Sequence, residues 1–88
     1  MQTAVLSTAD ISTRYGRGYL AILALLAGEL RKGASTTTRA RRRASNTRAE
    51  ELRVVLVTLL QADHFMVGEL AAETVVTHIR VFREDETQ

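Results

Sequence analysis

The feature that most constrains this chain of 88 residues is a stretch without any large apolar side chain, residues 34–46, set between two apolar segments. The stretch contains only alanine, serine, threonine, arginine and asparagine. Because such side chains bury little apolar surface, we expect a flexible basic loop here. Loops of this length inside a compact domain are often functional or disordered. The chain therefore divides into an apolar segment on each side of the loop and a C-terminal third.

A helix over residues 13–32 is predicted before the loop. Its apolar side chains recur at helical steps, which place them on one face. They are Tyr15, Tyr19, Ile22, Leu23, Leu26 and Leu30. Ser12 or Thr13 is suited to cap the start of this helix, and Gly33 is suited to end it. Residues 1–12 are expected to form an N-terminal arm.

A second helix is predicted over residues 47–62. Thr47 followed by Glu50 has the spacing of a capping box. The apolar face consists of Leu52, Val55, Leu56, Leu59 and Leu60. Val54 and Val57 extend the apolar character around most of the helix, which is typical of a central helix or of an oligomer interface. In so small a chain we expect a homodimer formed through the five residues of the apolar face.

The C-terminal third, residues 64–84, fits two structures. Steps of three and four residues favour a helix. The segment TVVTHIRVF, residues 74–82, is rich in β-branched and aromatic types, which favour strands. The predicted fold is therefore one mainly α domain with a long basic loop, with either a helical C-terminal third or a β-hairpin. The hairpin alternative would give an α+β, winged-helix-like fold.

Charge is unevenly placed along the chain, although the formal net charge is only +2. Residues 31–53 carry eight basic and two acidic side chains, a net charge of +6. Residues 54–88 carry two basic and six acidic side chains, a net charge of −4. This asymmetry indicates that an anionic partner would bind the middle of the chain.

The arginines in and beside the loop are the predicted nucleic-acid-binding residues: Arg39, Arg41, Arg42, Arg43 and Arg48. A guanidinium group stays charged and binds phosphate through two parallel hydrogen bonds. Residues 34–46 contain no aromatic side chain, which argues against recognition of single strands by base stacking. The alternatives are an acidic protein surface as the partner, or a loop that is merely solvated.

Residues 67–84, VGELAAETVVTHIRVFRE, resemble the helix-turn-helix of DNA-binding regulators. Leu70 and Ala71 stand where that motif packs its first helix, and Thr77 stands where it caps the recognition helix. Val75 occupies the turn, where the motif usually has glycine. The resemblance implies that His78, Ile79, Arg80 and Arg83 face the major groove or its phosphates.

Catalysis is not predicted. The chain has no cysteine, which excludes disulfides and thiolate chemistry, and its two histidines form no nucleophile–base set. No cofactor, metal or small-molecule substrate is expected. The segment RRAS, residues 42–45, resembles a site for basic-directed serine kinases, which would place a phosphate on Ser45.

No segment is predicted to enter a membrane. The run YLAILALLA, residues 19–27, is shorter than the roughly 20 apolar residues that a bilayer requires, and no export signal is recognised. A cytoplasmic location is therefore expected. The predicted function is DNA binding by a small regulatory or accessory protein. The alternative is a non-enzymatic protein-binding module or inhibitor whose basic loop docks on an acidic or nucleic-acid-binding surface of its partner.

Overall fold

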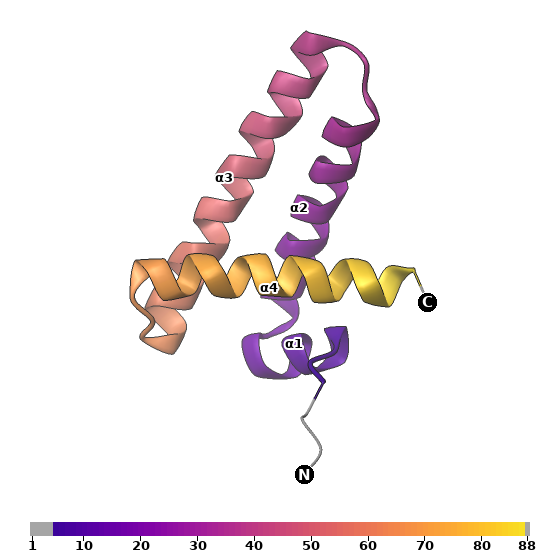
Figure 1. The fold of residues 1–88 in the computed structure, drawn as a ribbon. Coiled ribbons are helices and arrows are strands. Elements are labelled where there is room, and N and C mark those ends of the chain that lie inside the picture. Colours follow the sequence, from indigo (N-terminus) through magenta and orange to yellow (C-terminus); the bar gives the residue numbers. More distant parts are fainter. Residues whose placement is uncertain (1–4, 88) are drawn as a thin grey trace.

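Four helices make up the computed structural model, which describes residues 5–87 (Figure 1). They are α1 (Thr8–Tyr15), α2 (Arg17–Ser35), α3 (Arg39–His64) and α4 (Gly68–Glu86). No strand occurs in this part of the chain. The mainly α prediction agrees with this architecture, whereas the β-hairpin and the α+β, winged-helix-like alternative are wrong.

The first predicted helix, residues 13–32, is two helices in the structure. Gly16 separates α1 from α2 and has a φ of 96°, a conformation that residues with a Cβ atom rarely adopt. α1 begins earlier than predicted because Ser7 and Asp10 form a capping box, in which each side chain accepts a hydrogen bond from the backbone N–H of the other. The predicted N-terminal arm is therefore helical from residue 8, and its residues 1–4 lie outside the described part.

The predicted loop at residues 34–46 is mostly helical. α2 continues to Ser35 and α3 begins at Arg39, eight residues before the predicted start, so only residues 36–38 connect the two helices. Alanine and arginine are strong helix formers, which explains the early start. Small side chains explain the packing, because Gly33 of α2 is buried against Ser45 of α3 and both helices approach closely there.

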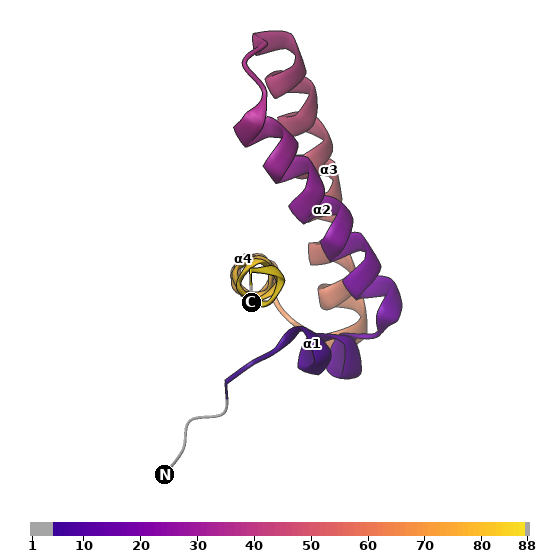
Figure 2. The ribbon, with the colours of Figure 1, turned by 90° about the vertical axis from the view of Figure 1, so that its right-hand side faces the viewer.

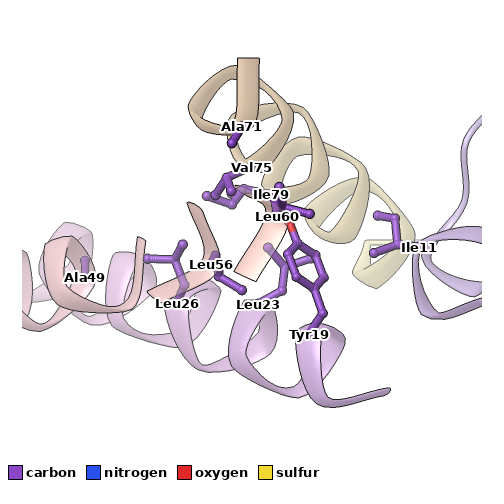
Figure 3. Close-up of a cluster of buried hydrophobic side chains, with 10 residues drawn as sticks. All are labelled: Ile11, Tyr19, Leu23, Leu26, Ala49, Leu56, Leu60, Ala71, Val75 and Ile79. Carbon is purple, nitrogen blue, oxygen red and sulfur yellow. The ribbon is translucent and has the colours of Figure 1, made fainter. Parts of the chain in front are cut away.

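α2 and α3 run antiparallel as a hairpin, and α4 crosses one face of that hairpin (Figures 1 and 2). α1 packs against α2 and α4 at the end where α2 starts. The core lies between these elements, and Leu23, Leu56, Leu60 and Val75 are completely buried in it (Figure 3). Burial of such side chains is the main force that stabilises a fold of this size.

α4 is continuous from Gly68 to Glu86 and passes through Val75 without a break. The helix-turn-helix resemblance expects a turn at this residue. Instead Ala71, Val75 and Ile79 follow one another at steps of four and are buried on the hairpin side. The strand preference of the β-branched residues is a small free energy, and burial of this apolar row outweighs it.

Candidate nucleic-acid interface

The end of the α2–α3 hairpin that lies away from α1 carries most of the positive charge. We call this region the basic tip (Figure 1, the magenta bend between α2 and α3). Its cations are Arg31 and Lys32 from α2, and Arg39, Arg41, Arg42, Arg43 and Arg48 from α3. All seven are exposed. The five arginines predicted from the basic run therefore lie together, on a helix rather than on a loop.

Three cations of the basic tip are paired with carboxylates. Glu29 lies 3.4 Å from Nζ of Lys32 and 3.2 Å from Nε of Arg48. Arg31 pairs with Glu86 at the end of α4. Burial alone would raise the pKa of the Glu29 carboxyl, but the hydrogen bond and charge of Arg48, together with Lys32, hold that pKa below its ordinary value. Glu29 is therefore ionised and fixes these two cations at the base of the tip.

The other four arginines, Arg39, Arg41, Arg42 and Arg43, have no carboxylate within 4.0 Å among the described residues. Arg42 donates a hydrogen bond to the backbone oxygen of Thr36 at 3.1 Å, which leaves its charge uncompensated. These four residues form the unpaired arginine cluster, and it occupies the first two turns of α3.

The cations of the tip lie on both sides of α3. Arg39, Arg42 and Arg43 line an open groove of about 860 Å³ that continues along the helix to Val54. Arg41 and Arg48 lie on the other side, where they border a hollow of about 600 Å³ together with Lys32 of α2. The hydroxyl-bearing residues Ser35 and Thr36 also line this hollow. Cations beside hydroxyl groups suit a phosphate ester in this hollow, whereas Glu50 and Glu51 confine the anion-binding part of the groove to its arginine end.

The start of α3 is electrostatically unfavourable in the isolated chain. The first turn contains no acidic residue, and the N-cap residue Thr38 makes no side-chain hydrogen bond to the backbone. The positive end of the helix dipole therefore meets the unpaired arginine cluster. An anion bound here would interact favourably with the arginines and with the free backbone N–H groups at once.

The residues suggested by the helix-turn-helix resemblance are less well placed to contact nucleic acid than the arginines of the basic tip. Arg83 lines a shallow hollow with Arg31 and Lys32, close to the tip. Arg80 is exposed on α4. His78 is only 2% exposed, and its Nδ1 atom lies 2.7 Å from the hydroxyl of Tyr19. This side chain belongs to the core, so the prediction that His78 contacts nucleic acid is wrong.

The residues predicted as a dimer interface are divided between the core and the surface. Leu56 and Leu60 are completely buried within the chain (Figure 3), which leaves them no surface for a partner. Leu52 and Leu59 are half-buried, and Val55 is 44% exposed. Ser45, the residue of the kinase-like segment, is buried between α2 and α3 and is not accessible to a kinase in this structure.

A cluster of four rings was missed from the sequence. The Tyr15 ring lies 4.6 Å from that of His64 and 4.7 Å from that of His78, measured between ring centroids. Tyr19 completes the cluster. The step of four placed the tyrosines on one face, and the helical alternative placed His78 on the apolar face of the C-terminal third. Nothing in the sequence indicated that these two faces would meet, or that His64 would join them. Arg31 and Lys32 were counted in the basic stretch of residues 31–53 but were not predicted to bind nucleic acid.

Comparisons with protein-family models, with curated proteins and with solved structures found no match to this chain. Among residues 5–87, no single helix is long and apolar enough to cross a membrane. α3 and α4 taken together reach that length and composition, but they bend by 117° at their junction.

Proposed function

We propose that this protein binds the phosphate backbone of duplex DNA through the basic tip, as a small regulatory or accessory protein. The observation that carries this proposal is the unpaired arginine cluster, four exposed guanidinium groups without a carboxylate partner among the described residues. The bend between α2 and α3 extends beyond α4 and α1 (Figure 1), while the acidic end of α4 lies at the base of the tip, where Glu86 pairs with Arg31.

The helical form of the tip supports this proposal better than a flexible loop would. Arg39 and Arg43 are one helical turn apart, about 6 Å along the axis, and Arg42 lies beside them. Because the backbone is already ordered, binding costs less conformational entropy than the folding of a loop on its ligand. A guanidinium group also fits phosphate in a bidentate geometry that lysine does not offer.

Affinity is expected to depend on salt and little on base sequence. Four neutralised phosphates would give a slope of about −3.6 in the plot of log affinity against log salt concentration. Contacts to phosphate set the position of a protein on the duplex but do not read bases. An accessory role, in which another component supplies sequence specificity, fits this chemistry best.

The experiment is fluorescence anisotropy with a labelled random duplex across a salt series. The test variant combines Arg41→Ala, Arg42→Ala and Arg43→Ala. We expect the slope of its salt dependence to be smaller in magnitude than that of the unsubstituted chain by about 2.7, the value for three lost phosphate contacts.

The matched control combines Arg14→Ala, Arg17→Ala and Arg53→Ala, three arginines that lie outside the tip and are not among the predicted nucleic-acid-binding residues. Both triple variants lower the net charge by three, so a difference between them reports the position of the charge and not its amount. Equal losses in the two variants would reject the tip as the binding site. Absence of binding by the unsubstituted chain at low salt would reject the proposal, and binding of polyglutamate in the same assay would then favour an acidic protein partner.

A further inference from the structure

The hollow of about 600 Å³ between the end of α2 and the start of α3 differs from the open groove on the other side of α3. We call it the tip hollow. Lys32, Ser35 and Thr36 line it from the side of α2 and of the connection, and Arg41 and Arg48 line it from α3. Among the described residues, no carboxylate lines it, whereas the groove contains two.

The sequence of α3 explains why a hollow forms here. Arg41 and Arg48 are seven residues apart on one face of the helix, about 10 Å along its axis. Between them lie Ala44 and Ser45, which have small side chains. A Cβ atom added to Gly33 of α2 would lie 3.6 Å from the Cβ atom of Ser45, so the two helices approach closely at this level. Two long cationic side chains therefore flank a floor of small residues.

The floor carries a hydroxyl group that has no partner in the protein. Ser45 lines the tip hollow and is only 4% exposed. A helical hydroxyl can donate to the backbone oxygen four residues earlier, as Thr47 does to Arg43 at 2.9 Å. Ser45 makes no such side-chain hydrogen bond among residues 5–87, although buried polar groups normally have a partner. Its hydroxyl is left to whatever occupies the hollow.

The charge of the tip hollow matches a phosphate monoester. Glu29 lies 3.4 Å from Nζ of Lys32 and 3.2 Å from Nε of Arg48, and Arg41 has no carboxylate within 4.0 Å among the described residues. Three cations and one carboxylate leave a formal charge of +2. A phosphodiester within a DNA strand carries about −1, whereas a terminal phosphate carries about −1.5 to −2 at pH 7.

The donors of the tip hollow also suit a terminal phosphate. A phosphate within a strand is held by two ester bonds and has two non-bridging oxygens, whereas a terminal phosphate is held by one and has three free oxygens. It can therefore extend from the strand end into a recess. Because Glu29 contacts Arg48 through Nε, both Nη groups of that arginine stay available to a ligand, and an ammonium such as that of Lys32 has three donors.

We propose that the tip hollow binds the terminal phosphate monoester of a DNA strand, with Lys32, Arg41 and Arg48 around the phosphate and the Ser45 hydroxyl donating to it. The protein would then bind preferentially at phosphorylated DNA ends. This inference rests on the proposed function, because the arginines outside the hollow supply the contacts to the adjoining duplex.

The lining of the tip hollow favours a DNA end over a phosphorylated peptide. No large apolar side chain lines it, so nothing there would recognise the side chains beside a phosphoserine. Arg39, Arg42 and Arg43 continue the positive charge on the other side of α3. A strand that places its terminal phosphate in the hollow has further phosphates for these arginines, which a singly phosphorylated peptide lacks.

Fluorescence anisotropy with hairpin DNA duplexes, labelled in the loop and with one open end, tests the inference. The open end carries a 5′-phosphate, a 3′-phosphate or hydroxyl groups alone. A hydroxyl-ended hairpin that is one base pair longer is the control for charge, because it adds two phosphodiester charges. We expect one phosphorylated hairpin to bind about tenfold more tightly than this control, roughly the effect of one more hydrogen bond to a charged group. The preferred hairpin identifies which strand end is bound.

Two matched pairs of variants locate the site. Arg41→Ala should reduce the preference for the phosphorylated hairpin to about twofold. Arg43→Ala removes the same charge from the groove side of α3, so it should weaken binding of all the hairpins and keep the tenfold preference. Ser45→Ala changes no charge and should lower the preference about threefold. Thr47→Ala, its control, removes a hydroxyl outside the hollow and should leave the preference unchanged.

The outcomes separate this inference from the proposed function. Equal affinity for the phosphorylated hairpins and the longer hydroxyl-ended hairpin would overturn the inference and leave duplex binding intact. A preference that survives both Arg41→Ala and Ser45→Ala would overturn the assignment to the tip hollow. Absence of binding to every hairpin at low salt would reject both, and binding of a phosphoserine peptide in the same assay would then identify the hollow as a site for a phosphorylated protein.

Discussion

The hydroxyl of Tyr19 lies 2.7 Å from Nδ1 of His78, and this buried hydrogen bond joins α2 to α4. The two side chains are 4% and 2% exposed. Burial lowers the pKa of His78 to about 4, and burial also raises the pKa of Tyr19 well above its ordinary value. Both rings are therefore neutral over the physiological pH range, and the pair acts as a polar contact within an apolar core.

The first prediction is that acid destabilises the fold before its carboxylates titrate. The pKa of His78 is lower in the folded chain than its ordinary value of 6.5, so the unfolded chain binds a proton more readily. The free energy of unfolding is then unaffected above pH 7 and falls as the pH drops through 6.5 toward 4. We expect a loss of about 2 kcal/mol between pH 7.5 and pH 5, measured by urea denaturation at each pH.

The control for this prediction is His78→Gln, which keeps a polar group at the position but does not titrate. Its free energy of unfolding should change little between pH 7.5 and pH 5. The carboxyls of Asp10, Glu29 and Asp85 have lowered pKa values, so any contribution they make to the free energy of unfolding is lost only at lower pH. Parallel pH profiles for the two proteins would show that His78 is not the group responsible.

The second prediction concerns the Tyr19 hydroxyl. Tyr19→Phe removes the partner of a buried imidazole nitrogen, and we expect a loss of about 1 to 3 kcal/mol in the free energy of unfolding at pH 7.5. The double variant Tyr19→Phe with His78→Phe removes both polar groups. Its loss in the free energy of unfolding should be smaller than the sum of the losses in Tyr19→Phe and in His78→Phe. Strictly additive losses in this double-mutant cycle would contradict an interaction between the two side chains.

Sequence reasoning predicted helices over residues 13–32 and 47–62 and left the C-terminal third open between a helix and a hairpin, and it did not predict how far the helices extend. It expected a loop at residues 34–46 because none of the side chains there is large and apolar. In the structure, the small size of Gly33, Ser45 and Ala49 allows α2 and α3 to approach, so burial in this region comes from close backbone contact. Close packing of small residues depends on a neighbouring helix, and a single segment does not reveal that neighbour.

The candidate site was predicted in part for a similar reason. Arg39, Arg41, Arg42 and Arg43 were identified because charge is visible in the sequence. Whether a charged group is paired often depends on tertiary structure, as the contact of Glu29 in α2 with Arg48 in α3 demonstrates. His78 was assigned to a DNA-facing surface from local resemblance, whereas its position in the core depends on Tyr19, 59 residues away in the sequence.

The third prediction separates stability from binding at the basic tip. Thr38 is the N-cap of α3 but forms no capping hydrogen bond. Thr38→Asp adds a carboxylate that accepts from the free backbone N–H groups and interacts well with the helix dipole, so we expect about 0.5 to 1 kcal/mol of added stability. The same negative charge should weaken duplex binding. A variant that gains stability and also binds duplex more tightly would contradict phosphate binding at this helix start.

The fourth prediction uses the end of α3. Phe65 has a φ of 54°, a left-handed conformation that costs a residue with a Cβ atom about 1 to 2 kcal/mol, and its side chain is 93% exposed. Phe65→Gly relieves this strain and removes no core contact, so the free energy of unfolding should rise by about 0.5 to 1 kcal/mol in urea denaturation. Phe65→Ala is the control, because it removes the same ring but keeps the Cβ atom, and it should not stabilise the fold. A loss of stability in both variants would mean that the exposed ring makes a stabilising contact, and the measurement should then be repeated across protein concentrations to test whether that contact is with a second copy.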